Sequence, residues 1–380
     1  MDYCFSNHNL SCIKEIKPKV EYFFLYIFIS LASVFTVFLN LLVIISISHF
    51  KQLHTPTNLL ILSLAVADLL VGLIVIPLMG IRYIETCWYF GETFCSLFPF
   101  ILYTIVSASL GNLVFISIDR YIAVKDPLQY PTRVTTNKAV FCIILNWLCS
   151  SIYSIIILYD AIFISENPNT CYGDCIVTVK YEYVLTDLIV SLVAPCSVII
   201  SLYGQIFCIA KYQARLINSV TNVSKSEKKA AKTLGIVIAV YLLCWIPYYI
   251  TSLFPGHDTN ESAVINIMGW ILYLNSSINP LIYALFYQWF RISTKHILSL
   301  KIFNPSSEYL SLFPDDGLFG GTVEKFTQQF SAAQKQNEAI KHILPQWLAA
   351  PPFRARVELH SRPALFCPGN SVLNQALTDS

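Results

Sequence analysis

Charged residues are scarce in this sequence. Aspartate, glutamate, lysine and arginine make up 13% of its 380 residues, whereas they make up about 25% of a typical soluble domain. Hydrophobic residues make up 55%, and the formal net charge is only +2. This composition excludes an ordinary soluble domain and favours a protein that crosses a membrane several times. So small a net charge gives no reason to expect a nucleic-acid partner.

The sequence contains long apolar runs between its few charged residues. Seven of them reach the roughly 17–25 residues that a helix needs to cross a bilayer. We therefore predict an all-α membrane protein, a bundle of seven transmembrane helices within residues 22–302. The predicted spans cover residues 22–48, 58–83, 94–121, 139–163, 183–210, 234–254 and 263–286.

Basic residues are unevenly divided between the connections. Those after odd-numbered spans hold most of the lysine and arginine, while the even-numbered connections are acidic on balance. Because positively charged loops stay in the cytoplasm, we expect residues 1–21 to be extracellular and residues 303–380 to form a cytoplasmic tail. The chain does not begin with a basic segment, a short apolar stretch and a cleavage site, so we expect no removable signal peptide.

Several protein classes are disfavoured by what the spans lack. We find no similarity between the two halves of the chain, although many secondary transporters are built from such repeats. We also find no nucleophile–base pair or metal-ligand cluster at a spacing that an enzyme could use. A light receptor would need a lysine for retinal in the seventh span, and residues 271–280, ILYLNSSINP, contain none. A transporter that uses Asp68 and Asp187 stays as a minor alternative.

Half of the twelve cysteines fall on the predicted outer side. An even number in an oxidising compartment predicts disulfides, but sequence alone cannot choose among the pairings. The acceptor sequons at Asn9 and Asn260 predict glycosylation on the same side, whereas the one at Asn222 lies inside and should stay unmodified. The outer cysteines are Cys4, Cys12, Cys87, Cys95, Cys171 and Cys175.

Asp68 is a carboxylate in the middle of the second span, where an ionised group is costly and usually functional. The third and seventh spans can supply further oxygens around it, from Ser109, Asn275, Ser276 and Asn279. We predict a hydrogen-bond network that holds a partly hydrated Na⁺ as an allosteric ion. The alternative is the same network without an ion, and we expect no other cofactor.

The inner end of the third span carries Asp119, Arg120 and Tyr121. Glu227, at the start of the sixth span, can pair with Arg120 when the two helix ends approach. A charge pair that breaks as helices separate is a switch element. The alternative is a surface salt bridge worth less than about 1 kcal/mol.

A series of landmark residues runs along the seven spans. They are Asn40, Asp68, Asp119-Arg120-Tyr121, Trp147, Pro195, Cys244-Trp245-Ile246-Pro247 and Asn279-Pro280-Leu281-Ile282-Tyr283. In this order they resemble the class A (rhodopsin-like) G-protein-coupled receptors, from about residue 22 to residue 301. The resemblance implies that the sixth span moves outward and that a heterotrimeric G protein binds around Arg120. The residues implied in coupling are Asp119, Arg120, Tyr121, Tyr203, Glu227 and Tyr283.

Three stretches are more specific. They are residues 275–290, NSSINPLIYALFYQWF, residues 85–95, ETCWYFGETFC, and residues 171–175, CYGDC. They resemble the trace amine-associated receptors. The resemblance implies an amine ligand, a stimulatory or olfactory-type G protein that raises cyclic AMP, and the plasma membrane of olfactory cilia. It also implies the disulfides Cys95–Cys175, Cys4–Cys171 and Cys12–Cys87.

Amine receptors of this kind usually hold the ligand's ammonium group with an aspartate on the third span. The matching position, about 18 residues before Arg120, is Leu102 here. Asp187 in the fifth span offers a substitute carboxylate. We predict that it pairs with the ammonium, between aromatic rings that attract cations and beside two serines. The other predicted ligand-binding residues are Tyr103, Ser107, Ser191, Trp245, Tyr248, Tyr249 and Tyr273.

Other interpretations of Asp187 stay open. The side chain can reach the outer water, pair with Lys180, or be protonated in an apolar niche. A monoamine is our first choice of ligand and a long di- or polyamine the second, because Asp187 is the only carboxylate at this depth. The main rival function is a seven-helix receptor with a non-amine ligand, or a pseudo-receptor with none.

The end of the chain departs from the resemblance. Residues from about 288 to 300 predict a short amphipathic helix that lies on the lipid at the inner surface. Residues 317–380 match nothing in the family and are predicted to be mostly disordered. We interpret them as a mispredicted exon or read-through rather than a domain.

Overall fold

The computed structural model describes residues 2–6, 10–14, 16–163, 171–175, 181–216, 223–253, 261–304 and 307–312. The chain forms two compact units, Met1–Leu310 and Ser311–Ser380. Only Ser311 and Leu312 of the second unit are described, so the predicted atypical tail lies outside the described residues. The sequons at Asn9, Asn222 and Asn260 and the alternative partner Lys180 also lie outside them.

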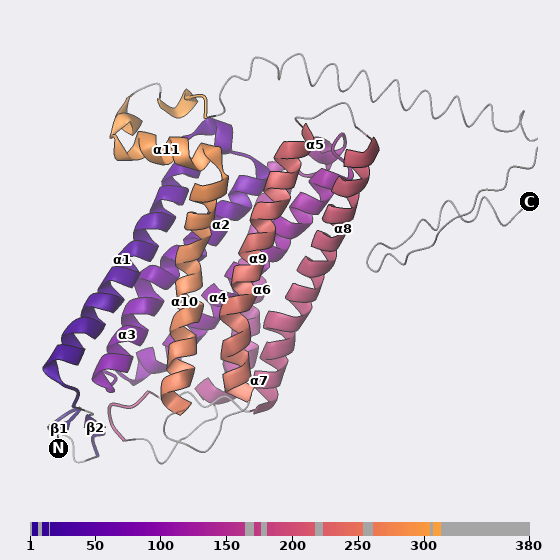
Figure 1. Cartoon of the computed structure of the whole chain (residues 1–380). Coiled ribbons are helices and arrows are strands. Elements are labelled where there is room, and N and C mark those ends of the chain that lie inside the picture. The colour runs from indigo at the N-terminus through magenta and orange to yellow at the C-terminus, as the bar shows by residue number, and fades with distance from the viewer. Residues whose placement is uncertain are drawn as a thin grey trace, which may run out of the picture. The chain divides into compact units, whose positions relative to one another are not determined.

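Long helices pack side by side in the first unit (Figure 1). Five helical stretches of the described residues are long and apolar enough to cross a membrane: Lys19–His49, Pro56–Glu85, Glu92–Lys125, Thr136–Tyr159 and Glu182–Ile209. The sixth span contains a shorter apolar helix, Ala239–Thr251, and Glu261–Phe286 forms the seventh. The observed architecture is the all-α bundle that the apolar runs predict.

The described residues form two strands and a series of helical elements. The two strands are β1 (Asp2–Tyr3) and β2 (Ile13–Lys14). The helices are α1 (Lys19–His49), η1 (Lys51–Leu53), α2 (Pro56–Leu70), η2 (Val71–Val75), α3 (Ile76–Glu85), α4 (Glu92–Lys125), α5 (Tyr130–Arg133), α6 (Thr136–Phe163), α7 (Tyr181–Leu188), η3 (Ile189–Val193), α8 (Ala194–Leu216), α9 (Val223–Leu253), α10 (Glu261–Phe286), α11 (Gln288–Leu298), η4 (Lys301–Phe303) and η5 (Ser307–Tyr309).

Two spans change their winding next to a proline. The second span consists of α2, the π-helical segment η2 and α3, and the fifth of α7, the π-helical segment η3 and α8. Pro77 and Pro195 follow these segments and cannot donate to the carbonyl group four residues back. For Pro195 that carbonyl belongs to Ser191, and the Tyr241 hydroxyl of α9 donates to it at 3.2 Å. Single π-helical turns are frequent at functional sites, and Asp187 lies two residues before the start of η3.

Polar side chains and one glycine fix the contacts between helices. Asn40 of α1 donates to a backbone carbonyl of α10 at 3.0 Å. Trp147 of α6 donates to the Ser63 hydroxyl of α2 at 3.1 Å. The helices α4 and α6 approach closely at Gly111, where a Cβ atom would overlap the Asn146 side chain. Hydrogen bonds of this kind hold helices together where no water competes.

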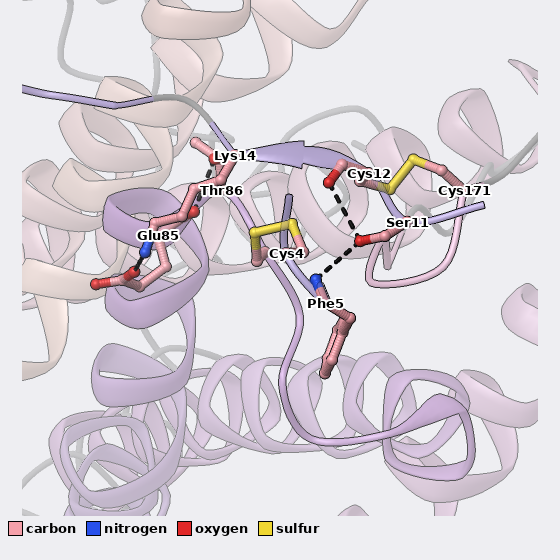
Figure 2. Close-up of a disulfide and its surroundings, with 9 residues drawn as sticks. Cys4, Phe5, Ser11, Cys12, Lys14, Glu85, Thr86 and Cys171 are labelled. Atoms are coloured by element: carbon pink, nitrogen blue, oxygen red, sulfur yellow. Dashed lines mark hydrogen bonds and ion pairs between the residues drawn. A yellow bond between two sulfur atoms is a disulfide. The ribbon is translucent and has the colours of Figure 1, made fainter. Parts of the chain in front are cut away.

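A small hairpin lies at one end of the bundle, near α1 and α3 (Figure 1). Strands β1 and β2 pair antiparallel, with Tyr3 opposite Ile13. Lys14 of β2 forms an ion pair with Glu85 at the end of α3 (Figure 2), and Tyr26 of α1 donates to the same carboxylate at 2.6 Å. The hydrogen bond to Glu85 raises the pKa of Lys14, so the Lys14 ammonium stays charged at neutral pH.

Disulfides tie this hairpin to the bundle. The bond Cys95–Cys175 is the one that the resemblance implied. The other two bonds are Cys4–Cys87 and Cys12–Cys171 (Figure 2). The implied pairing of Cys4 with Cys171 and of Cys12 with Cys87 is therefore wrong.

The backbone register explains this correction. The N–H of Cys12 donates to the Tyr172 carbonyl at 3.0 Å, and the N–H of Tyr172 donates to the Leu10 carbonyl at 2.8 Å. These bonds place the Cα atoms of Cys12 and Cys171 4.9 Å apart, within the usual range for a disulfide. Cys4 is left opposite Cys87, with a Cα–Cα distance of 5.7 Å.

The helix α11 turns away from α10 at the other end of the bundle (Figure 1). Trp289 and Phe290 are buried, whereas Arg291 and Lys295 are exposed. The helix α11 therefore has a buried apolar face and an exposed basic face, and it lies where the sequence predicts an amphipathic helix.

Candidate functional site

A cavity lies between α4, α7, α9 and α10. It encloses about 490 Å³, open space at its mouth included. Leu102, the position that carries an aspartate in many amine receptors, is part of its wall. Seven of the eight predicted ligand-binding residues line it: Tyr103, Ser107, Asp187, Ser191, Trp245, Tyr248 and Tyr273.

Three hydroxyl groups hold the Asp187 carboxylate. Tyr153 of α6 donates to Oδ1 at 2.7 Å, and Ser191 donates to the same oxygen at 2.8 Å. Tyr249, the eighth predicted residue, donates to Oδ2 at 2.8 Å. A carboxylate has about four acceptor positions. About one position is therefore left on a group that borders the cavity.

Tyr153 is a site residue that the sequence did not identify. Its only signal is a hydroxyl group in the fourth predicted span, which also contains Asn146, several serines and Asp160. Tyr159 has the same signal six residues later, but this side chain is 51% exposed. The fourth span therefore offers two tyrosines with the same signal, and only the hydrogen bond from Tyr153 to Asp187 distinguishes them.

Asp187 has no cationic partner among the residues that the structure describes. The ion pairs found there are Lys14–Glu85, Lys51–Glu308, Arg120–Asp119 and Arg133–Asp126. The carboxylate is thus fixed in place by neutral donors and borders a cavity. A cation in the cavity would supply the missing charge.

The helix α9 presents a column of three stacked rings to the fifth span. The Tyr241 and Trp245 rings lie 5.2 Å apart at 26°, and the Trp245 and Tyr249 rings lie 5.9 Å apart at 25°. Of the three, Trp245 lines the cavity, and its buried Nε1 has no hydrogen-bond partner among the described residues. A ligand in the cavity can therefore contact the middle ring of the column.

Asp68 belongs to a second buried polar set. It is 1% exposed, and Asn279 donates to its Oδ2 at 2.9 Å. The other oxygen of Asp68 and Oδ1 of Asn275 are buried without a hydrogen-bond partner in the described part of the chain. Ser109, Asn275 and Ser276 line a neighbouring space of about 330 Å³. Buried acceptors without donors are costly, so this set of oxygens fits a cation.

Comparisons with known proteins agree with these features. The family described as "7 transmembrane receptor (rhodopsin family)" matches residues 39–283. Trace amine-associated receptor 9 of Mus musculus is 43% identical over 335 residues, which are 83% of this chain and 96% of the relative. Trace amine-associated receptor 13c of Danio rerio is 39% identical over 327 residues, 82% of this chain and 96% of the relative.

The chain belongs to the rhodopsin-like receptors, in the trace amine-associated subfamily. It is therefore a multi-pass protein of the plasma membrane and a receptor rather than an enzyme. A small-molecule ligand and a heterotrimeric G protein are the partners that this family implies. The seven-helix class predicted from the apolar runs is confirmed.

Arg120 of the receptor is held by side chains of α2, α4 and α5. It pairs with Asp119 at 2.6 Å and donates to the hydroxyl groups of Thr57 and Tyr130. Tyr130 also donates to Asp119 at 2.7 Å. The side chain of Glu227 lies outside the described part, so its pairing with Arg120 stays a prediction.

The other predicted coupling residues lie on three helices of the receptor. Tyr283 of α10 is 5% exposed and Tyr203 of α8 is half-buried. Tyr121 of α4 is also half-buried, and the Lys125 ammonium lies 5.4 Å from its ring centroid.

Proposed function

We propose that this receptor recognises amines and that the ligand's ammonium group pairs with Asp187. The names of its relatives, trace amine-associated receptors, support an amine ligand. One observation carries the pairing: a carboxylate that borders the cavity is held by three hydroxyl groups and has no cation beside it in the described residues.

The cavity offers two kinds of attraction to an ammonium group. A hydrogen bond to a charged group is worth about 1.5–3 kcal/mol, and each aromatic face adds roughly 0.5–2 kcal/mol. Among the described residues that line the cavity, Asp187 is the only carboxylate, which favours a monoamine over a di- or polyamine. The aromatic faces are those of Tyr103, Trp245, Tyr248 and Tyr273.

The proposed signalling follows from the resemblance. The receptor would act through a stimulatory or olfactory-type G protein, raise cyclic AMP and work in olfactory cilia. The hairpin end would face the outside, which the distribution of basic residues supports. Breaking of the Arg120–Glu227 pair would accompany activation.

A Na⁺ ion is the proposed allosteric partner of the Asp68 set. Asp68, Ser109, Asn275, Ser276 and Asn279 would hold it, since hard cations prefer oxygen ligands. The ion would supply the positive charge that the buried carboxylate lacks.

The test is a cyclic AMP screen of a panel of amines and their uncharged analogues on cells that express the full chain. Asp187→Asn should raise the concentration for half-maximal response roughly 10- to 150-fold, because a charge-assisted bond of about 1.5–3 kcal/mol is lost. Glu92→Gln makes the same change at an exposed position at the start of α4 and should respond like the wild type.

Each rival predicts a different outcome of this screen. An unchanged amine response in Asp187→Asn would contradict the pairing. Responses only to uncharged compounds would identify a non-amine receptor, and no response at all would favour a pseudo-receptor. Uptake of a substrate by the cells would favour a transporter.

A further inference from the structure

The sixth span is attached to the fifth at two points. Tyr249 of α9 donates its hydroxyl to Asp187 Oδ2 at 2.8 Å. Tyr241, two turns earlier on the same helix, donates to the Ser191 carbonyl at 3.2 Å. The first attachment uses a carboxylate that borders the cavity, and the second uses a backbone group beside Pro195.

A hinge lies between the two attachments. Pro247 is inside α9, where proline removes a backbone hydrogen bond and lets a helix bend. Trp245 is stacked between Tyr241 and Tyr249. Loosening the Tyr249 attachment would therefore let the two halves of α9 change their angle while the Tyr241 attachment stays in place.

The two oxygens of Asp187 are occupied differently. Oδ1 accepts hydrogen bonds from Tyr153 and Ser191, whereas Oδ2 accepts only one, from Tyr249. Because each carboxylate oxygen accommodates about two donors, an ammonium in the cavity finds its free position on Oδ2. A charged donor binds more strongly than a neutral hydroxyl. The ammonium thus shares the oxygen that holds Tyr249, and by drawing on its negative charge it weakens the Tyr249 hydrogen bond rather than that of Tyr153.

We propose that the Tyr249–Asp187 hydrogen bond restrains α9 in the ligand-free receptor and that the ligand's cationic group releases it. Tyr249 is then a positioning residue that connects recognition to the hinge at Pro247. The release step rests on the proposed pairing of an amine with Asp187, but the restraint itself needs no ligand. Arg120 is engaged with Asp119 in the same structure.

Tyr249→Phe tests the restraint because it removes only the hydroxyl group. Ligand-free nucleotide exchange should rise several-fold per purified receptor, measured with a panel of G proteins so that the result does not depend on one type. Asp187→Ala removes the acceptor from the other side and should raise ligand-free exchange as well. Ser197→Ala removes an exposed hydroxyl that bonds only to the Val193 carbonyl of its own span and should keep the wild-type level.

Tyr153→Phe separates the restraint from a general effect on Asp187. It removes a donor to the same carboxylate from α6, a helix without this hinge, so its ligand-free exchange should rise less than that of Tyr249→Phe. Equal rises in the two variants would overturn the proposal. Wild-type exchange in both Tyr249→Phe and Asp187→Ala would overturn it too.

The restraint and the amine pairing can fail separately. Loss of the amine response in Asp187→Asn, with no rise in ligand-free exchange in Tyr249→Phe and Asp187→Ala, would remove the restraint and keep the pairing. Raised ligand-free exchange in these two variants, with a normal amine response in Asp187→Asn, would keep the restraint and remove the pairing.

Discussion

Leu102 and Asp187 border the same cavity from α4 and α7. In the receptors that this chain resembles, the carboxylate for the ligand is usually at the Leu102 position. Here that wall is apolar and the negative charge comes from the fifth span. A ligand would therefore place its ammonium near α7 and its apolar body toward Leu102, the reverse of the usual orientation.

Moving the carboxylate back should restore recognition. Asp187→Asn combined with Leu102→Asp puts the same charge on another wall of the same cavity, so we expect amine responses to return with a changed order of preferred amines. The measurement is the cyclic AMP response normalised to receptor at the cell surface. Leu102→Asn in the same background adds polarity without charge and should not restore the response. A surface-expressed Asp187→Asn, Leu102→Asp receptor that ignores every amine would count against a shared cavity.

Most of the site could be predicted because membrane spans make polar residues conspicuous. Polar residues such as Asp187 and its serine neighbours are rare in apolar spans. Together with nearby aromatic residues, they could therefore be assigned to the wall of a ligand cavity. Tyr153 was missed because the sequence does not show which way a tyrosine in a span points. Tyr153 donates to Asp187, whereas Tyr159 of the same span is 51% exposed.

At the scale of elements, helices were easier to predict than their interruptions. The length and apolarity of the runs indicated every span. The π-helical segments η2 and η3 precede Pro77 and Pro195, and the sequence does not show how the helix backbone adjusts to each proline. The disulfides of the hairpin show the same limit. Their pairing depends on which backbone groups of residues 10–12 face residue 172, and cysteine positions alone do not contain that register.

The contact between α4 and α6 gives a prediction about stability. Gly111→Ala would push a methyl group into Asn146 and disturb its hydrogen bond to the Ala108 carbonyl, which is 2.8 Å long. Overpacking of this kind costs about 1–3 kcal/mol, so the melting temperature of the purified receptor should fall by several degrees. Gly204→Ala, where a Cβ meets nothing within 4 Å, should leave it unchanged or slightly higher. Equal melting temperatures for the two variants would contradict this account of the contact.

For the whole molecule, the orientation in the membrane is the expectation most open to test. The distribution of basic residues favours an outer N-terminus, and the three disulfides gather at the hairpin end. Disulfides persist on the oxidising side of a membrane, so both arguments put the same end outside.

Glycosylation reports this orientation directly. Asn9→Gln and Asn260→Gln should each increase the electrophoretic mobility of the receptor from cells, because each removes a glycan on the outer side. Asn222→Gln should cause no shift, since its sequon is predicted to face the cytoplasm. A shift with Asn222→Gln alone would mean that the orientation is inverted.

The amine hypothesis is tested most directly by a solved structure of the receptor with an activating amine bound. We predict that the ligand nitrogen lies about 2.7–3.2 Å from Asp187 Oδ2 and that the Tyr249 hydroxyl has moved away from that oxygen. A nitrogen held elsewhere in the cavity, with all three hydroxyl groups still bonded to Asp187, would contradict the account.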